Sequence, residues 1–305
     1  MEENIAIVGS GPAGYTAGLY AARASLEPIL FEGLESGGQL MLTTDVENYP
    51  GFKGGIMGPD LVQEFKSQAE KFGTKILPLT ISSIKKVSEG FELFTNKESY
   101  FFKSVIISSG ASAKWLGVEG EKRLQGYGVS ACATCDGFFF KDKIVIVVGG
   151  GDSAMEEALF LTKFAKKVYV VHRRASFRAS SIMQKRVMDH KKIEVLWNKE
   201  VKEVNGGDSV TSISLKDTEN NTKEKLKADA LFVAIGHTPN VAFLGDLLVL
   251  DEKGYIKTGF TTQTSTSVDG IFASGDVADS IYRQAITAAG TGCQAAMDAE
   301  RWLES

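Results

Sequence analysis

Short apolar runs that end in a glycine-rich turn occur twice in the chain and indicate buried parallel strands. Residues 5–8 and residues 144–148 are such runs, and each turn leads into a segment rich in Ala and Leu. An uninterrupted apolar run is typical of a strand buried on both faces, and the following segments, residues 15–24 and 155–165, are typical of helices. The pattern therefore predicts two units of the α/β class.

The stretch after the first of these units predicts a helix followed by antiparallel strands. Apolar positions recur at helical spacing over residues 58–72, so one face of this segment would pack on the core. Residues 76–102 alternate between apolar and polar positions, with turn residues at 88–90 and 96–98. We expect this part to form a β-meander inserted in the first unit.

An apolar strand that leads into glycine closes each unit. Residues 104–110 show this pattern in the first half of the chain, and residues 230–236 repeat it in the second. A third short run, residues 270–276, ends in Gly275 and Asp276, and a helix follows from about Gln284. We expect this last piece to return to the first unit and to complete its site, so that the second unit is inserted within the first.

The first glycine turn has the spacing of a dinucleotide-binding turn. Gly9, Gly11 and Gly14 form G-x-G-x-x-G between a strand and a helix. In that motif the glycines permit a tight turn and a close approach to pyrophosphate, and the helix N-terminus presents free N–H groups to it. Glu32 ends the next strand, 21 residues beyond Gly11, where a carboxylate accepts hydrogen bonds from a ribose. A glycine-rich turn before a surface helix is the alternative for the motif taken alone.

The second glycine turn repeats the spacing but differs at the decisive place. Gly149, Gly151 and Ala154 match G-x-G-x-x-A, and the residue 21 positions beyond Gly151 is basic. The basic residues there are His172, Arg173, Arg174 and Arg178. Arginine forks suit a phosphate, whereas a carboxylate repels one and suits a free ribose hydroxyl. We therefore interpret the first site as one for FAD or NAD and the second as one for NADPH; a solvated basic strand end is the alternative for the arginines.

Two nucleotide sites in one chain indicate a flavoprotein that passes hydride between cofactors. The expected fold is α/β, with two Rossmann-like nucleotide-binding domains (three-layer, with β-meander), the NADPH domain inserted into the FAD domain. We place the FAD domain at residues 1–113 and 246–305, and the NADPH domain at residues 114–245. Asp276 would hydrogen-bond the polyol chain of the flavin; an ordinary helix N-cap is the alternative for this aspartate.

Cys132 and Cys135 form a C-x-x-C motif that precedes the second glycine turn. A four-coordinate zinc site would need two more ligands, and the chain has no second closely spaced pair of Cys or His, so we expect no metal. A pair of inert buried thiols is another alternative. We favour a dithiol–disulfide couple that takes electrons from reduced flavin and passes them to an external disulfide. Asp136 would be the general acid for the thiolate, or only a turn or N-cap residue. The third cysteine, Cys293, is expected to be buried and structural, and we assign no catalytic histidine.

Composition excludes several classes of protein. The chain has 305 residues, of which 43% are hydrophobic and 24% charged, with a formal net charge of -4 and three cysteines. This is a globular composition, with no basic surplus for nucleic acid and too few cysteines for a disulfide-stapled secreted fold. The apolar runs are too short to span a membrane, and the acidic residues 1–4 lack the basic start of a secretory signal. We expect a cytoplasmic protein.

Taken together, the motifs resemble those of the low-molecular-weight, bacterial-type thioredoxin reductases over essentially the whole chain. The most specific is C-A-T-C-D-G at residues 132–137. The others, in the family's order, are the two glycine turns, Gly37-Gly38-Gln39-Leu40, residues 46–51, His172-Arg173-Arg174, Gly275-Asp276-Val277 and residues 282–285. The resemblance implies an FAD-containing homodimer that uses NADPH to reduce the disulfide of oxidised thioredoxin. It also implies that Cys135 faces the flavin, that Cys132 attacks thioredoxin, and that Asp136 donates the proton.

The resemblance further assigns residues to each cofactor. The FAD site, which includes the loop at residues 32–39, would be lined by Gly9, Ser10, Gly11, Pro12, Ala13, Gly14, Glu32, Gly33, Gly37, Gly38, Gln39, Leu40, Asn48, Gly275, Asp276, Arg283, Gln284 and Ala285. The NADPH site would be lined by Gly149, Gly151, Asp152, Ser153, Ala154, His172, Arg173, Arg174, Arg178, Ile235 and Gly236. One small departure is Asp152-Ser153, where Asn-Thr is common in the family.

The layout has a mechanistic consequence. The cysteine pair and the nicotinamide must both reach one flavin, yet both belong to the inserted domain. We therefore expect a rigid-body rotation about the two chain crossings, near residues 111–118 and 239–246. Three alternative functions stay open. The first is a ferredoxin or flavodoxin reductase that uses NADPH, which would lack the cysteine pair. The second is a reductase whose flavin receives electrons from reduced ferredoxin, against which the arginines argue, and the third is a redox sensor that binds FAD without turnover.

Overall fold

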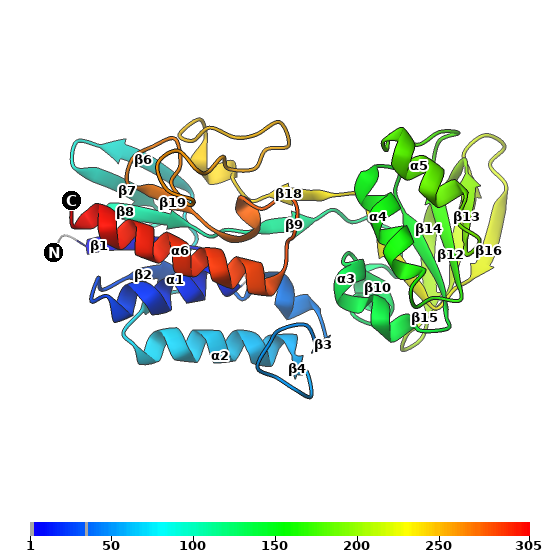
Figure 1. Cartoon of the computed structure of the whole chain (residues 1–305), viewed down its shortest axis with the longest axis horizontal. Coiled ribbons are helices and arrows are strands. Elements are labelled where there is room, and N and C mark those ends of the chain that lie inside the picture. Colours follow the sequence, from blue (N-terminus) through cyan, green and yellow to red (C-terminus); the bar gives the residue numbers. More distant parts are fainter. Residues whose placement is uncertain (1–2, 34–35) are drawn as a thin grey trace. The chain divides into compact units, whose positions relative to one another are not determined.

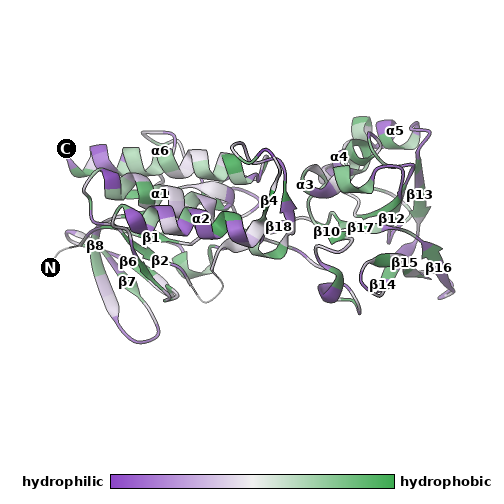
Figure 2. Cartoon of the chain, turned by 90° about the horizontal axis from the view of Figure 1, so that it is seen from below, coloured by the Kyte–Doolittle hydropathy of each residue, from purple (hydrophilic) through white to green (hydrophobic). Residues whose placement is uncertain are grey.

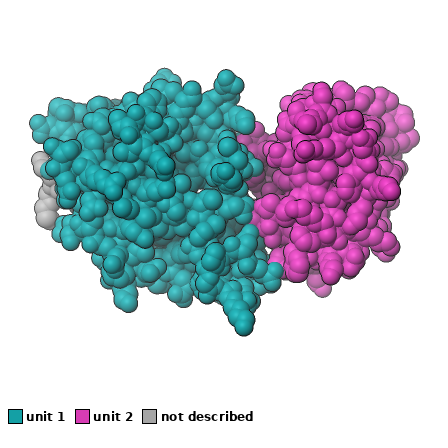
Figure 3. Space-filling view, viewed as in Figure 1, with its two compact units in different colours: residues 1–112, 238–305 teal, residues 113–237 magenta. Residues whose placement is uncertain are grey.

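Two compact units make up the protein, and the chain leaves the first unit once and returns to it once. The computed structural model describes residues 3–33 and 36–305. Unit 1 comprises residues 1–112 and 238–305, and unit 2 comprises residues 113–237 (Figure 3). Outside the described residues lie Met1 and Glu2 of the acidic start, and Leu34 and Glu35 of the loop expected to line the FAD site.

Unit 1 is built on a parallel sheet whose strands end together. In spatial order these strands are β5 (Lys75–Leu77), β2 (Ile29–Phe31), β1 (Glu3–Val8), β8 (Ser99–Ile107) and β19 (Ile271–Ala273). Val8 is in register with Phe31 on one side and with Ile107 on the other, and Ala273 is in register with Ile107. The carboxyl ends of four strands therefore meet at one edge, which is where open α/β sheets bind ligands.

Three helices cover one face of this sheet. They are α1 (Pro12–Arg23), α2 (Gly58–Lys71) and α6 (Ala285–Leu303) (Figure 1). Helices α1 and α6 pack so closely that a Cβ on Gly292 would overlap the carbonyl group of Ala13. Ile5 and Ile7 of β1 are buried beneath the helices. Hydrophilic and hydrophobic residues alternate along α2 and α6 (Figure 2), as in helices with one buried face.

The opposite face of the sheet carries the predicted antiparallel meander. Strands β6 (Ser83–Val87) and β7 (Gly90–Phe94) pair with the first half of β8, and Phe91 and Phe102 fill the core between the layers. Two separate strands were expected where β8 runs unbroken, because no glycine or proline interrupts residues 99–107. A small antiparallel pair, β3 (Asp45–Val46) and β4 (Ile56–Met57), precedes α2.

Unit 2 contains a second parallel sheet. In spatial order its strands are β10 (Val129–Ser130), β17 (Ala230–Val233), β11 (Ile144–Val148), β12 (Lys167–His172) and β13 (Ile193–Trp197). Val145 and Val147 belong to the core on one face of this sheet, and Ile146 and Val148 to the core on the other. Because both faces are covered, the run at residues 144–148 is apolar at every position.

Helices cover one face of the second sheet, and a second meander covers the other. The helices are α3 (Ala133–Asp136), α4 (Asp152–Leu161) and α5 (Ser181–Met188). The meander consists of β14 (Lys199–Gly206), β15 (Val210–Asp217) and β16 (Lys223–Lys227). The sequence pattern predicts a meander only in the first unit, because β14 and β16 are rich in Lys and Glu. No helix in the described parts of either unit is long and apolar enough to span a membrane.

The two chain crossings pair with each other as a short ribbon. It consists of β9 (Ala111–Ala113) and β18 (His237–Pro239). The first boundary falls between residues 112 and 113, one residue before the expected place, but unit 1 resumes at Thr238 rather than at residue 246. The reason is that a 3-10 turn, Ala242–Leu244, packs on unit 1, where Leu244 is buried in the core.

Candidate functional site

The glycine turn of unit 1 follows β1 and opens α1. Gly9 has a φ of 118°, and a Cβ there would overlap the backbone of Ser108, so glycine is required by conformation and space. Gly11 is different, because its φ of -78° suits any residue and no atom lies within 4 Å of a Cβ built there. Gly11 is also the N-cap of α1 and has no side chain to occupy the first N–H groups of the helix. The open space in front of it is room for a phosphate.

Ser10 ties this turn to the loops that the family resemblance places around FAD. Its hydroxyl donates a 2.9 Å hydrogen bond to the carbonyl oxygen of Glu32 and accepts a 3.1 Å hydrogen bond from the N–H of Gly37. A Cβ on Gly38 would lie 3.6 Å from the Cα of Gly11. The structure thus brings these five expected residues together at the carboxyl edge of the sheet.

The carboxylate of Glu32 lies directly after β2 and is buried. It accepts a hydrogen bond from the phenol of Tyr15 on α1 and forms a 2.8 Å ion pair with Lys66 on α2. Burial, together with the hydrogen bond to Glu32, raises the pKa of Tyr15, so the phenol keeps its proton and donates a hydrogen bond to the carboxylate. Neither Tyr15 nor Lys66 belongs to a motif, and sequence reasoning missed both.

Asp276 lies in the 3-10 turn Gly275–Val277, directly after β19. Burial raises its pKa to about 7; the negative charge of Asp279 adds to the shift and Arg283 opposes it. The N-cap of α6 is Gln284, so capping of that helix does not explain the aspartate. A carboxyl group that keeps a proton near neutral pH is able both to donate and to accept a hydrogen bond, which suits a polyol.

The segment before α6 brings two distant expected residues into contact. The side-chain amide of Asn48 donates a 3.4 Å hydrogen bond to the side-chain oxygen of Gln284. Ala285 is the first residue of α6. The guanidinium of Arg283 donates to the carbonyl oxygen of Ser280 at 2.9 Å, which braces the turn that holds these residues.

The glycine turn of unit 2 repeats the geometry of the first. A Cβ on Gly149 would overlap the carbonyl oxygen of Ala234, whereas no atom lies within 4 Å of a Cβ built on Gly151. Gly151 is the N-cap of α4 and, like Gly11, has an ordinary φ, here -98°. Ile235 and Gly236 follow Ala234, so they lie beside this turn at the carboxyl end of β17. The structure therefore provides a second open place for a phosphate.

His172 ends β12 and is buried, with its two ring nitrogens facing carbonyl oxygens of the protein. Nδ1 lies 2.9 Å from the oxygen of Gly149 and Nε2 lies 2.9 Å from the oxygen of Ser176. Burial lowers the pKa of the imidazole. A Cβ on Gly150 would overlap the ring. His172, which was expected to hold NADPH, therefore links the glycine turn to the basic loop, because both its ring nitrogens face carbonyl oxygens of the protein.

The basic loop, residues 173–178, is anchored from within and exposes its arginines. The carbonyl oxygen of Gly150 accepts hydrogen bonds from the backbone N–H groups of Arg178 at 2.7 Å and of Ala179 at 3.1 Å. Phe177 is buried against Trp197, with ring centroids 4.3 Å apart. Arg173, Arg174 and Arg178 are exposed. The glycine turn and the basic loop are thus joined by hydrogen bonds, and the loop exposes its arginines.

Asp152 and Ser153 stand at the first turn of α4. One carboxylate oxygen of Asp152 accepts hydrogen bonds from the N–H of Ser180 at 2.9 Å and from its hydroxyl at 2.7 Å. Ser180 is the N-cap of α5, so Asp152 joins the starts of two helices. The departure from the family's Asn-Thr therefore has a local structural role, while Ser153 stays exposed beside the open turn.

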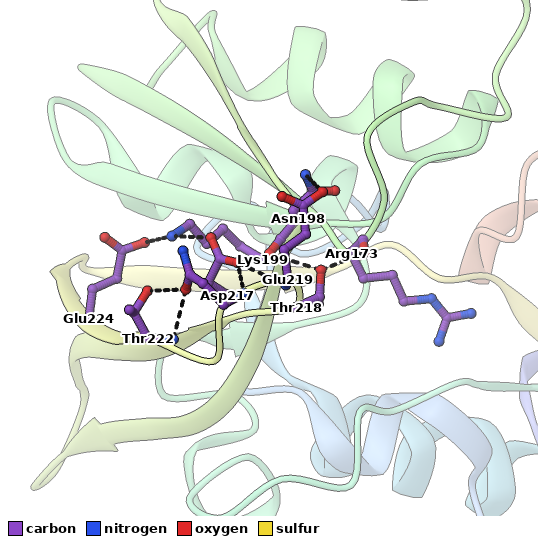
Figure 4. A network of polar contacts seen from close by, with 9 residues as sticks. Arg173, Asn198, Lys199, Asp217, Thr218, Glu219, Thr222 and Glu224 are labelled. Carbon is purple, nitrogen blue, oxygen red and sulfur yellow. Dashed lines mark hydrogen bonds and ion pairs between the residues drawn. The ribbon is translucent and has the colours of Figure 1, made fainter.

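The turn between β15 and β16 is itself well braced (Figure 4). Lys199 forms ion pairs with Asp217 at 3.1 Å and with Glu224 at 3.2 Å. Hydrogen bonds from the backbone N–H groups of Asn220 and Glu219 lower the pKa of Asp217, so the carboxylate stays ionised. The end of the meander is thereby a rigid neighbour for the basic loop.

This turn supports the basic loop from outside. The hydroxyl of Thr218 lies 3.3 Å from the carbonyl oxygen of Arg173 and 3.2 Å from that of Asn198. The backbone N–H of Asn198 donates to the carbonyl oxygen of Arg174 at 3.4 Å. In Figure 4 the guanidinium of Arg173 points away from the network. The backbone of Arg173 is therefore held, while its charged group extends free of these contacts.

Cys132 and Cys135 form a disulfide in the structure, with their Cα atoms 5.3 Å apart. β10 leads into α3, whose N-cap is Cys132, and Cys135 lies within the helix. The side chain of Cys135 is exposed and that of Cys132 is half-buried. Two exposed rings, Phe138 and Phe139, lie in the 3-10 turn Gly137–Phe140 that follows α3. A disulfide bond is the paired state that an exchange reaction requires.

Asp136 follows Cys135 and is partly buried. Burial raises the pKa of its carboxyl group, and a hydrogen bond with Ser130 opposes that shift. An acid that holds its proton above the usual pH range suits proton donation to a thiolate. The remaining cysteine, Cys293, lies in α6 as expected, but it is half-buried rather than buried, with its sulfur 3.9 Å from that of Met297.

Both units present the parts that an adenine dinucleotide needs. Each has an open glycine turn at the start of a helix, and each places a selective group at the end of the neighbouring strand. In unit 1 that group is the carboxylate of Glu32, which fits free ribose hydroxyls. In unit 2 it is a set of exposed arginines, which fits a 2′-phosphate.

Comparisons with known proteins show which family the chain resembles over nearly its whole length. Residues 3–292 match the family model of the pyridine nucleotide-disulphide oxidoreductases. The thioredoxin reductase of Streptomyces clavuligerus is 51% identical over 303 residues, which cover 98% of this chain and 94% of the relative. The solved structure of thioredoxin reductase from Giardia duodenalis has a TM-score of 0.95 at 45% identity, covering 99% of both chains. That from Streptococcus pyogenes has a TM-score of 0.94 at 40% identity, covering 98% of this chain and 97% of the other.

Proposed function

The chain belongs to the pyridine nucleotide-disulphide oxidoreductase family and, within it, to the bacterial-type thioredoxin reductases, and we propose that it passes electrons from NADPH, through FAD and the Cys132–Cys135 disulfide, to oxidised thioredoxin. The observation that carries this proposal is the C-x-x-C disulfide beside a raised-pKa aspartate, in the same unit as an arginine-flanked nucleotide turn. An electron-carrier reductase has no use for such a disulfide.

The overall reaction balances with one proton. NADPH gives up a hydride, which carries two electrons; these reduce the Cys132–Cys135 disulfide to two thiols, and exchange then reduces the disulfide of thioredoxin. The sum is NADPH, a proton and thioredoxin disulfide giving NADP⁺ and thioredoxin dithiol. When bound, FAD supplies the two-electron relay between the nicotinamide and the disulfide.

Within this scheme the two cysteines have different roles. Cys132 attacks the disulfide of thioredoxin, and Cys135 is the partner that faces the flavin. Asp136 holds a proton because burial raises its pKa, and it donates that proton to the thiolate. These assignments follow the family, and the position of Asp136 one residue after Cys135 supports them.

The nucleotide assignments follow from the two turns. In unit 1, Gly11 gives the pyrophosphate of FAD room, Glu32 binds its adenosine ribose, and Asp276 binds its polyol chain. In unit 2, Gly151 gives the pyrophosphate of NADPH room, and the exposed arginines bind the 2′-phosphate.

The proposal also covers a movement between the domains, the oligomeric state and the cellular location. The cysteine pair and the NADPH site both belong to unit 2, and the FAD site belongs to unit 1. Each must therefore meet the flavin in turn, which a rotation about the ribbon of β9 and β18 would allow. We further propose a homodimer in the cytoplasm, where thioredoxin keeps thiols reduced.

The test is a stoichiometry. The purified protein is mixed with NADPH and oxidised thioredoxin, and free thiol is measured against NADPH consumed, with Cys135→Ser as the comparison variant. We expect two thiols for each NADPH, and none with the variant. Consumption of NADPH without thiol, unchanged in the variant, would instead indicate an oxidase or an electron-carrier reductase. A protein that reduces thioredoxin with reduced ferredoxin but not with NADPH would refute the assignment of the electron donor.

A further inference from the structure

The carboxylate of Glu32 is held by two side chains from two different helices. The phenol of Tyr15 on α1 and the ammonium group of Lys66 on α2 both contact the same carboxylate oxygen, Oε1. The side chain of Glu32 is only 7% exposed and that of Lys66 is 28% exposed. Tyr15 is fully buried. These contacts lie within unit 1 and join β2, α1 and α2.

The second carboxylate oxygen is left available. Within residues 3–33 and 36–305 no hydrogen bond is made to Oε2 of Glu32. The hydroxyl of Ser10, which also belongs to the glycine turn, fixes the backbone of Glu32 through its carbonyl oxygen at 2.9 Å. The residue is therefore held at its backbone and at one oxygen of its carboxylate, while the other oxygen remains free to accept a hydrogen bond.

We propose that Lys66, together with Tyr15, is a positioning residue that keeps the carboxylate of Glu32 oriented for the adenosine ribose of FAD. This inference rests on the proposed function, since it takes FAD as the ligand of unit 1. Burial disfavours the ionised form of a carboxyl group, and a cationic partner offsets this cost. The ammonium group of Lys66 does not block the ribose, since it contacts Oε1 and leaves Oε2 to the ligand.

Lys66 lies well outside the glycine turn, and the chain offers a matched control for it. Lys71 ends the same helix, is exposed, and has its Nζ 5.9 Å from the centroid of the Phe72 ring. Lys66→Met and Lys71→Met remove the same charge from the same helix. Only the first removes the ion pair with Glu32.

The experiment measures flavin affinity rather than turnover. The full-length protein is stripped of flavin and titrated with FAD and, separately, with FMN, which lacks the adenosine half. We expect Lys66→Met to raise the Kd for FAD about tenfold, in line with the loss of a charge-assisted contact, and to leave the Kd for FMN unchanged. Lys71→Met should match the wild type for both ligands, and Lys66→Arg should restore most of the affinity for FAD.

The possible outcomes distinguish failure of the positioning role of Lys66 from failure of the proposed function. An unchanged Kd for FAD in Lys66→Met, or an equal loss for FAD and FMN, overturns the positioning role. A wild-type protein that binds no FAD overturns the proposed function instead. Should Lys66→Met not fold, Tyr15→Phe removes the other contact to Oε1 and is judged by the same ratio of FAD to FMN affinity: a selective loss for FAD supports the inference, and an unchanged ratio refutes it.

Discussion

The two glycine turns are nearly the same piece of backbone, yet the residues beyond them prepare for different ligands. Gly11 and Gly151 both have an ordinary φ and open space where a side chain would stand. Twenty-one residues further on, unit 1 has a buried acid and unit 2 has a buried histidine followed by exposed arginines. The scaffold therefore provides phosphate binding twice, and the end of the neighbouring strand decides which nucleotide is accepted.

The supports of the two selective groups differ as well. Glu32 is a buried charge, so it is held by an opposite charge, Lys66, and by a phenol, Tyr15. The arginines are exposed charges, so the protein holds their backbone and leaves the guanidinium groups to the ligand, with His172 and Thr218 on either side. A buried charged group needs an opposite charge beside it, whereas an exposed charged group needs only a fixed backbone.

The largest effects are expected when a side chain fills the open space in front of each turn. Gly11→Val and Gly151→Val should both fold, because neither position needs glycine for its conformation. We expect Gly11→Val to be purified without flavin, and Gly151→Val to keep its flavin while its KM for NADPH rises on the order of 100-fold, since several phosphate hydrogen bonds are lost. Flavin absorbance and steady-state kinetics give the two results. Loss of flavin in both variants would show that the turns are not independent.

Removing the positive charges of Arg173 and Arg174 tests what distinguishes the second turn from the first. In Arg173→Gln/Arg174→Gln, the KM for NADPH should rise roughly 10- to 100-fold, because contacts between charged groups and phosphate are lost. The KM for NADH, which has no 2′-phosphate, should stay within about twofold. Arg186→Gln, which changes an exposed arginine on α5, is the control. An equal rise for both nucleotides would mean that these arginines do not read the 2′-phosphate.

A pH measurement compares the acids of the two units. Burial raises the pKa of Asp276 to about 7, so the folded, flavin-free protein binds a proton that the unfolded chain releases near pH 4. The free energy of unfolding should therefore fall, by about 3 kcal/mol, as the pH rises from 4 to 7. Denaturant unfolding at several pH values, with and without flavin, measures this fall. Asp276→Asn should remove this part of the slope, and a slope that survives the substitution would assign it to another group, such as Asp136.

The smallest expected effect concerns the outer support of the basic loop. Thr218→Val removes the hydroxyl beside the carbonyl oxygen of Arg173, so the affinity for adenosine 2′,5′-bisphosphate should fall about threefold, with that for 5′-AMP unchanged. Thr222→Val is the matched control, because its hydroxyl donates a hydrogen bond to Asn220 within the same turn. Calorimetry of both nucleotides gives the ratio. Equal behaviour of the two variants would remove the meander from the selectivity of this site.

Most of the candidate site was accessible from the sequence because its signals are local. The two glycine turns, the cysteine pair and the strands around them depend on residues that are close in the chain, where spacing alone determines which groups meet. The boundary of the return crossing was less accessible. Residues 238–245 contain turn-forming residues such as Pro239, Asn240 and Gly245 and resemble a linker, but Leu244 is buried in the core of unit 1.

The amino-acid sequence alone predicts the pair of nucleotide turns, the opposite charges of the groups beyond them, and the cysteine pair. Only the tertiary structure decided what holds those groups: Lys66 on Glu32, Asn48 on Gln284, and both carbonyls at His172. Each of these contacts joins residues on separate elements. Such contacts depend on how helices and strands pack against one another, and no periodicity or spacing in the chain records that packing.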